Sequence, residues 1–250
     1  MRLLLLLAML APFTADAGDA CRATSGPRLR PLVELYTSEG CNSCPPADRW
    51  LARHFTPVTQ ATALAFHVDY WDGLGWKDRF ATPGHTARQY RAMRANGATF
   101  VYTPQVLVQG RDYSAWRRGA PDAALAGAAT RAPGAAIALA ARVSSDFVDV
   151  DVDVALEASP SSSTYLAVAY ADSGLSSDVK AGENRGERLR HDHVVRGLVT
   201  RDVRQPSARY SFRIARPAET GERPSLVAFV QETSSGAVLQ TVELSLEDCR

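Results

Sequence analysis

The chain has 250 residues, of which 22% are charged, and its formal net charge at pH 7 is +1. A charge balance this close to zero provides no electrostatic footprint for nucleic acid or an anionic membrane surface, so we expect neither as a partner. The hydrophobic content of 46% is typical of a globular protein. The length predicts one or two domains.

Residues 1–17 have the pattern of a secretory signal peptide. Arg2 supplies a positive start, residues 3–13 are an apolar run, and Ala15-Asp16-Ala17 is a small-x-small site for cleavage before Gly18. The run is shorter than the roughly 20 apolar residues that span a bilayer, so we expect no membrane anchor after cleavage. The mature protein is expected in the periplasm or outside the cell.

The chain has 4 cysteines, and in an oxidising compartment cysteines tend to be paired. The simplest pairing joins Cys41 to Cys44 and Cys21 to Cys249. The second bond would tie together the two ends of the mature chain, which often lie close to each other in a domain. In the chain-entropy model, closing so long a loop stabilises the fold by at most about 5 kcal/mol.

Residues 28–132 alternate between strand-like and helix-like patterns. Strands are predicted over residues 31–37 (PLVELYT), 61–71 (ATALAFHVDYW) and 101–110 (VYTPQVLVQG). A helix is predicted after Thr82 as N-cap, with Pro83 as its first residue and Gly97 just past its end. A short alanine-rich helix is predicted over residues 121–130. This alternation predicts an α/β domain.

Beyond Pro133-Gly134 the hydrophobic period changes to two. Residues 146–156 (DFVDVDVDVAL) alternate aspartate and valine, which is typical of a half-buried antiparallel strand. Four later segments have similar patterns, at residues 163–170, 208–215, 225–232 and 237–244. Short strands without a strong helix predict an antiparallel β-sandwich domain over residues 135–248.

Cys41 and Cys44 follow a predicted strand and precede a predicted helix, a position that suits thiol–disulfide exchange. The partial positive charge of a helix N-terminus stabilises a thiolate. We expect Cys41 to be the exposed nucleophile and Cys44 to resolve the mixed disulfide, without a bound cofactor. Because Pro45-Pro46 follow, Cys44 is expected in an irregular turn, with the helix starting near Pro46. The function predicted is an exported thiol–disulfide oxidoreductase acting on protein or small thiol substrates.

Two further features accompany the dithiol. Thr103-Pro104 precedes a strand of the same half, and a cis bond there would leave the backbone of Thr103 free to pair with a substrate peptide. Glu34 is an acidic residue inside an apolar strand. Its side chain either reaches solvent at the strand end or relays protons to Cys44.

Four segments together resemble a known family: VELYTSEGCNSCPPAD, FHVDYWDGLGWKDRF, YTPQVLVQGR and GENRGERLRHDHVVR. The family consists of secreted bacterial proteins with a thioredoxin-like domain and is known only as a domain of unknown function. The resemblance implies a thioredoxin-like α/β domain followed by the β-sandwich, with a redox-type site at Cys41 and Cys44. It implies a bacterial, periplasmic or secreted setting and no established activity.

Two other functions remain open. His67 could join Cys41 and Cys44 as a copper ligand in a metal-delivery module, or it could be a buried histidine bonded within the core. The charged segment 182–196, with His191 and His193 on one side of a strand, could bind metal, form a solvated turn or fold over the first half and shape the dithiol cleft. The remaining alternative is a non-catalytic secreted interaction protein in which the Cys41–Cys44 bond is structural.

Overall fold

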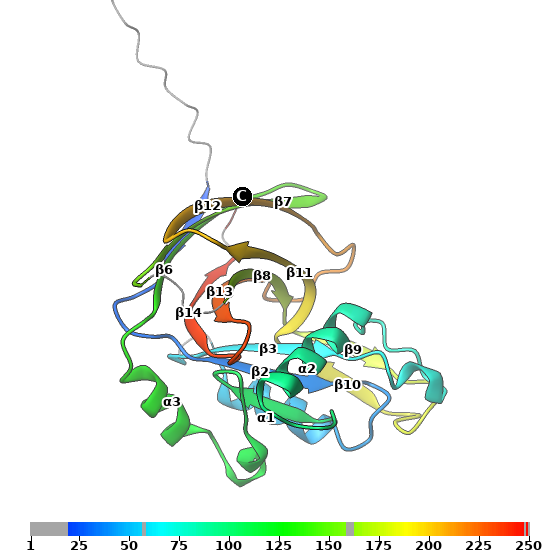
Figure 1. Cartoon of the computed structure of the whole chain (residues 1–250). Helices are drawn as coiled ribbons and strands as arrows, with labels where there is room; N and C mark the ends of the chain where they lie inside the picture. Colours follow the sequence, from blue (N-terminus) through cyan, green and yellow to red (C-terminus); the bar gives the residue numbers. More distant parts are fainter. Residues whose placement is uncertain (1–19, 57–58, 159–162, 248, 250) are drawn as a thin grey trace, which may run out of the picture.

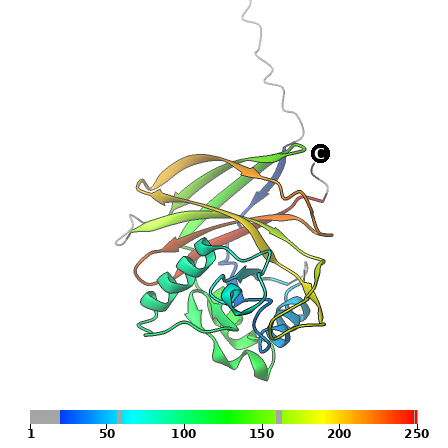
Figure 2. The same ribbon diagram turned by 90° about the vertical axis from the view of Figure 1, so that its right-hand side faces the viewer.

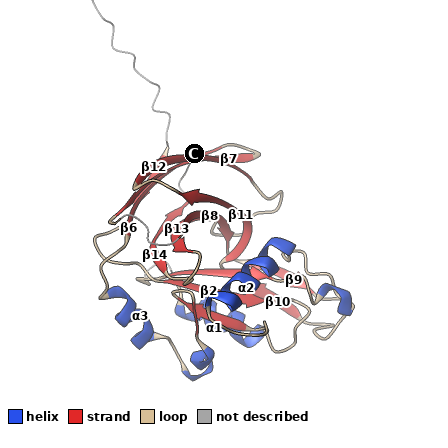
Figure 3. Ribbon diagram, viewed as in Figure 1, coloured by secondary structure: helices blue, strands red, loops and turns tan. Residues whose placement is uncertain are grey.

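A computed structural model of the chain describes residues 20–56, 59–158, 163–247 and 249 (Figure 1). The predicted signal peptide, residues 1–17, lies outside the described residues. The described part contains three α-helices, α1 (Pro45–His54), α2 (Pro83–Ala95) and α3 (Asp122–Ala129). It also contains two short 3-10 helices, η1 (Asp72–Leu74) and η2 (Ser114–Arg118). The other elements are strands (Figure 3).

The strands of the described residues form three sheets. The largest has eight strands of mixed direction, in the order β14 (Val238–Ser245), β13 (Ser225–Glu232), β8 (Thr164–Asp172), β11 (Val194–Val203), β3 (Thr62–His67), β2 (Leu32–Thr37), β4 (Gln105–Val108) and β5 (Arg111–Asp112). An antiparallel sheet of four strands has the order β1 (Cys21–Thr24), β6 (Ala135–Val143), β7 (Phe147–Leu156) and β12 (Ser207–Ala215). A two-stranded sheet pairs β9 (Leu175–Asp178) with β10 (Arg188–His191).

The predicted fold class, a thioredoxin-like α/β domain followed by an antiparallel β-sandwich domain, is wrong. Strands predominate, and β3 of the first half pairs in parallel with β11 of the second half at Ala65 and Val194. The two halves therefore share one eight-stranded sheet. Local hydrophobic periodicity identifies single strands but carries no information on pairing between residues so far apart. The domain limits at residues 28–132 and 135–248 remain predictions.

The two faces of the large sheet are buried by different elements. Val33 and Leu35 of β2 face α1 and pack with Leu51. Phe66 of β3 lies on the opposite face and packs in one cluster with Phe229 of β13. At the other end of the molecule the four-stranded sheet covers β8 and β13, and Figure 2 shows this layer on the side away from the helices.

The alternating segment 146–156 forms β7, as predicted. Its valines are buried between the sheets: Val148, Val150, Val152 and Val154. Its aspartates point outward, and two of them form ion pairs with arginines of the neighbouring strand β12: Asp149 with Arg213 and Asp153 with Arg209. The period of two in the sequence therefore follows from burial of one face.

The predicted limits of α2 and the predicted disulfide between the chain ends are confirmed. Thr82 Oγ1 accepts a hydrogen bond from the backbone of His85 (3.2 Å), and Gly97 has a φ of +65° just past the helix. Cys21 and Cys249 form a disulfide with Cα atoms 5.6 Å apart, which joins β1 to the C-terminal end. Among the described residues, none of the helices is long and apolar enough to cross a membrane.

Candidate functional site

The Cys41–Cys44 pair forms the second predicted disulfide, in the turn between β2 and α1. Its Cα atoms are 5.4 Å apart, and the backbone N–H of Cys44 donates to the Cys41 carbonyl (3.1 Å). Cys44 has helical dihedral angles (φ −79°, ψ −40°), and α1 begins at Pro45. Cys44 therefore lies in the turn before the helix, which starts one residue before the expected Pro46. Prolines fit the first turn of a helix because the N–H that they lack would have no partner within the helix.

Both cysteines are buried, with 0% of their surface exposed. The prediction that Cys41 is an exposed nucleophile is therefore wrong for this conformation. The two residues between the cysteines, Asn42 and Ser43, are exposed. Ser43 Oγ lies 3.3 Å from Cys41 Sγ. Because reactivity of a cysteine requires access to its sulfur, the disulfide is shielded from exchange in this structure.

Residues 182–186 of the second half cover the dithiol turn, and we call them the covering segment. Asn184 Nδ2 donates to the Cys41 carbonyl (3.1 Å) and is buried. The backbone N–H of Asn42 donates to Glu183 Oε2 (3.1 Å). The segment begins and ends with glycines at φ of 72° and 91°, a region that favours glycine. Of the three interpretations of this charged segment, folding over the first half is the one that agrees with these contacts.

Trp71 links the dithiol turn to the predicted substrate groove. A Cβ added to Gly40 would lie 3.1 Å from Trp71 Cβ, so Gly40 and Trp71 pack closely against each other. On its other side, Trp71 Nε1 donates to Thr103 Oγ1 (2.9 Å). The Thr103-Pro104 bond is cis. The structure therefore places Thr103 and the dithiol turn on either side of one tryptophan.

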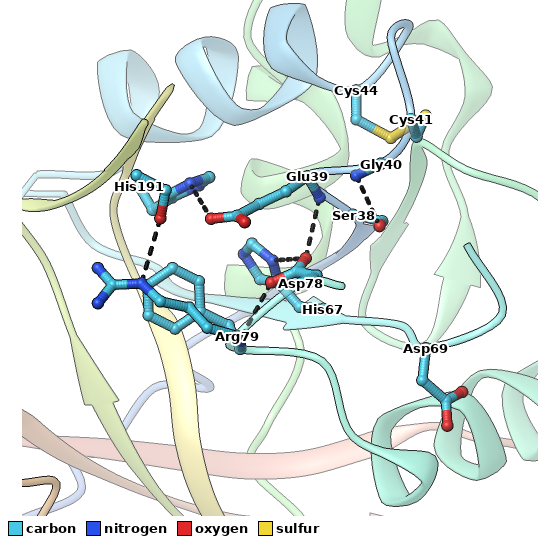
Figure 4. Close-up of polar contacts among 12 residues, drawn as sticks. Ser38, Glu39, Gly40, Cys41, Cys44, His67, Asp69, Asp78, Arg79 and His191 are labelled. Atoms are coloured by element: carbon cyan, nitrogen blue, oxygen red, sulfur yellow. Dashed lines mark hydrogen bonds and ion pairs between the residues drawn. A yellow bond between two sulfur atoms is a disulfide. The ribbon is translucent and has the colours of Figure 1, made fainter. Parts of the chain in front are cut away.

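Next to the dithiol turn lie four buried side chains that we call the His–acid cluster: Glu39, His67, Asp78 and His191 (Figure 4). His67 Nδ1 lies 2.6 Å from Asp78 Oδ2, which also accepts from the backbone N–H of Glu39 (2.9 Å). His191 Nε2 lies 3.1 Å from Glu39 Oε1, and the two imidazole rings are 5.1 Å apart. Glu39 is two residues before Cys41, so this cluster and the disulfide share one short segment.

The electrostatics of the cluster favour charged groups in spite of burial. Burial alone would lower the pKa of His67, but the Asp78 carboxylate beside it raises that pKa above its usual value. Burial would raise the pKa of Asp78, but His67 and two backbone N–H groups lower it. The pKa of Glu39 is lowered in the same way, with the hydrogen bond from His191 opposing the effect of burial. The cluster therefore holds carboxylates and a histidine that stabilise each other's charge.

Asp48 connects this cluster to α1. It lies one helical turn after Cys44, whose carbonyl accepts from the Asp48 backbone N–H (3.2 Å). Burial raises the pKa of the Asp48 carboxyl, while His191 and His67 lower it in part. Cys44 is the N-cap of α1 and Asp48 stands four positions later, so the two residues lie on one side of the helix.

Glu34, predicted to reach solvent or to relay protons to Cys44, does neither in this structure. It is buried on the face of β2 opposite to α1, and both Nε and Nη2 of Arg88 lie 2.7 Å from Glu34 Oε1. Arg88 Nη2 also donates to Gln231 Oε1 of β13 (2.9 Å). Glu34 therefore belongs to a buried ion pair that connects α2 with the second half of the chain.

The arrangement of His67 gives no support to the copper alternative. Its Nδ1 is occupied by Asp78, as expected of a histidine bonded within the core. Within the described residues, no group of three or more His, Cys, Asp or Glu side chains is placed to hold a metal ion. Asp69, two residues after His67, lies away from the His–acid cluster (Figure 4). Its carboxylate accepts a hydrogen bond from Thr86 Oγ1 (2.5 Å).

Three members of the His–acid cluster were not predicted from the sequence to lie at the dithiol site. Glu39 and Asp78 stand in loops, and for the segment that carries His191 the sequence leaves three alternatives open: a metal site, a solvated turn, or a segment folded over the first half that shapes the dithiol cleft. The one usable signal was the resemblance, since each of these residues lies inside a segment that carries it. Their contact depends on pairing between distant segments, which a single sequence does not display.

Comparison with known proteins identifies a family. The model of a family described as "Protein of unknown function (DUF1223)" matches residues 32–231. The crystal structure of protein AGR_C_4864 from Agrobacterium tumefaciens is similar, with a TM-score of 0.63 and 25% identity over 89% of this chain and 96% of that one. HBP35 of Porphyromonas gingivalis has a TM-score of 0.65 and 14% identity over 90% of this chain and 78% of that one, a likeness of fold alone. None of the curated proteins matches. Because the match over residues 32–231 spans most of the chain and includes the dithiol, the protein belongs to the DUF1223 family of unknown function.

Proposed function

We propose that this protein is an exported thiol–disulfide oxidoreductase that uses the Cys41–Cys44 pair on protein or small thiol substrates. The observation that carries the proposal is a disulfide with two intervening residues at the start of α1, beside a buried cluster of titratable side chains. The exported setting rests on the predicted leader and on the two disulfides.

The size of the closed loop favours a working bond over a staple. Cys41 and Cys44 are separated by 3 positions and Cys21 and Cys249 by 228. In the chain-entropy model the short loop contributes about 2 kcal/mol and the long one about 5 kcal/mol. The fold therefore gains most of its covalent stabilisation from Cys21–Cys249. As a purely structural bond, Cys41–Cys44 would contribute the smaller share of the stabilisation.

The exchange reaction is written for a substrate dithiol. A substrate thiolate attacks Cys41 Sγ, the Cys41–Cys44 bond breaks, and its electron pair goes to Cys44 Sγ. The second substrate thiolate then attacks the substrate sulfur of the mixed disulfide and releases Cys41. Two electrons pass to the protein, the substrate becomes a disulfide, and the reverse reaction oxidises a reduced partner.

Burial of both sulfurs favours a second candidate, a secreted interaction protein in which the bond is structural. A permanently covered disulfide is protected from exchange, and both cysteines are fully covered here. The first proposal requires that the covering segment opens, whereas the second requires that it stays closed. Access to Cys41 in the native protein therefore separates the two.

Single-cysteine variants test the proposal. Folded Cys44→Ser protein, incubated with oxidised glutathione, is expected to gain one glutathione at Cys41, because the resolving thiol is absent. Cys41→Ser is the matched control and is expected to react at least tenfold more slowly at Cys44. If both variants remain unmodified while folded, the proposed activity is wrong and the structural role stands.

A further inference from the structure

A cavity of about 400 Å³ lies where the large sheet curves back on itself. In the order of the sheet, three strands stand between β14 and β3. Glu243 of β14 nevertheless accepts a hydrogen bond from Thr62 of β3 (3.2 Å), so these strands meet across the curve that Figure 1 shows. Ligand sites are common in the mouths of β-barrels, in pockets of about 300–1,000 Å³. The cavity therefore has the place and the volume of a small-molecule site.

The cavity combines an apolar wall with charged groups at its rim. The buried wall includes Phe55 and two alanines, Ala61 and Ala63. The charged side chains that line the cavity are partly or fully exposed: Arg30, Arg223, Glu243 and Glu247. Two guanidinium groups and two carboxylates leave no net charge. The rim as a whole is therefore complementary to a ligand that carries both signs of charge, rather than to a simple anion or cation.

Several polar atoms of the rim are free to bind a ligand. Arg30 Nε donates to Thr62 Oγ1 (2.7 Å) and its Nη2 lies 3.5 Å from Glu243 Oε2, whereas its Nη1 bonds to none of the described residues. Glu243 also accepts through Oε2 alone within the described part of the chain, which leaves Oε1 open. Arg223 donates to Asp192 through Nη2 (2.9 Å). Cationic donors and an anionic acceptor are thus available side by side.

His193 adds a neutral acceptor to the cavity wall. Its Nε2 lies 2.8 Å from the Phe55 carbonyl, which can only accept, so Nε2 carries the hydrogen and Nδ1 is an acceptor. Burial lowers the pKa of His193, which keeps the ring neutral at pH 7. The φ of His193 is +60°, uncommon for a residue other than glycine, and its backbone N–H donates to Ser173 Oγ of the same cavity (2.9 Å). A ligand N–H group therefore finds acceptors on both His193 and Glu243.

We propose that this cavity binds a small zwitterion of the amino-acid or short-peptide class. The ammonium group of the ligand donates to Glu243 Oε1 and His193 Nδ1. Its carboxylate accepts from the free nitrogens of Arg30 and Arg223, and its apolar part lies on the wall that includes Phe55. The site does not depend on the proposed oxidoreductase function. Phe55 directly follows α1 and the disulfide directly precedes it, so the cavity and the dithiol turn lie at opposite ends of this helix.

The test is isothermal titration calorimetry of the mature protein with the dipeptide Gly-Leu. N-acetyl-Gly-Leu lacks the ammonium group, and Gly-Leu amide lacks the carboxylate. Each blocked peptide leaves a charged group of the rim without its partner, so each is expected to bind at least roughly tenfold more weakly than Gly-Leu. Glucose, which is neutral and hydroxylated, is expected not to bind.

Two charge variants identify the groups that hold the ligand. Glu243→Gln is expected to weaken binding of Gly-Leu at least roughly tenfold and to leave that of N-acetyl-Gly-Leu unchanged. Arg223→Gln is expected to weaken binding of Gly-Leu similarly and to leave that of Gly-Leu amide unchanged. Glu157→Gln, at an exposed position outside the cavity, is the matched control and is expected to bind like the wild type.

Three results with the wild type would overturn the proposal, and none of them requires a variant to fold. They are the absence of Gly-Leu binding at concentrations up to about 10 mM, equal affinities for the three peptides, and tighter binding of glucose than of Gly-Leu. Unchanged Gly-Leu affinity in folded Glu243→Gln and Arg223→Gln would place the peptide elsewhere and would also overturn it.

Discussion

Asn184 donates its side-chain amide to the main-chain carbonyl of Cys41 (3.1 Å), although the two residues come from opposite halves of the chain. The same amide donates to the Glu39 carbonyl (2.8 Å). One buried side chain thus holds the covering segment on the dithiol turn and on the segment that carries the His–acid cluster.

Removal of this contact is expected to expose the disulfide. In Asn184→Ala two buried hydrogen bonds are lost, which lowers the free energy of unfolding by about 1–3 kcal/mol and raises the reduction rate of Cys41–Cys44 by glutathione several-fold. Asn96→Ala is the matched control, because the side chain of Asn96 also donates to two carbonyls, those of Ala92 and Gly110 (both 2.8 Å). Asn96 lies far from the cysteines in the sequence. If both variants show the same reduction rate as the wild type, the covering segment does not limit access.

The buried Glu34–Arg88 pair is expected to be structural. Arg88→Met leaves an uncompensated buried carboxylate and is expected to lower the free energy of unfolding by about 3–5 kcal/mol. Arg209→Met, which removes the partner of exposed Asp153, is expected to have a much smaller effect because water screens that pair. Denaturant titration measures both losses, and equal losses would contradict the assignment.

His67 is expected to stabilise the fold on the acidic side of neutrality. The pKa of folded His67 is raised above its usual value of 6.5, so the contribution of His67 is complete below pH 6.5 and is lost as pH rises through the folded pKa. Unfolding free energies of wild type and His67→Gln, measured from pH 5.5 to 8.5, should therefore converge as pH rises. A difference that grows with pH over this range would have the wrong sign.

His85 provides the opposite case in the same core. Burial lowers its pKa from 6.5 to about 4, so the folded state takes up its proton only at lower pH than the unfolded chain. The resulting stability, on the order of 3 kcal/mol, is present above pH 6.5 and is lost as pH falls through that interval. His85→Gln should flatten the wild-type decline between pH 6.5 and 4, and an unchanged decline would show that other groups cause it.

The features that could be predicted from the sequence are those set by local chemistry. Thr82, Pro83 and Gly97 mark the ends of α2 because capping and positive φ depend on neighbouring residues alone. The Asp-Val alternation of β7 follows from burial of one strand face. Both disulfides followed from an even number of cysteines in a chain with a leader-like start.

The features that could not be predicted depend on contacts between distant segments. Pairing of Ala65 with Val194 joins the two halves in one sheet, and no local pattern indicates it. The dithiol turn is contacted by a segment more than a hundred positions later, whose Asn184 donates to the Cys41 carbonyl. Glu34 was considered as a relay from its position in the sequence alone, whereas strand geometry turns it toward Arg88.

The measurement that tests the central claim most directly is a redox titration of the mature protein in glutathione buffers, with thiols trapped by a mass tag and each cysteine pair followed separately. The proposed function predicts a Cys41–Cys44 midpoint between about −120 and −270 mV, the range of working oxidoreductases, with Cys21–Cys249 remaining oxidised. A Cys41–Cys44 pair that resists reduction to below about −300 mV would contradict the proposed function and identify the bond as structural.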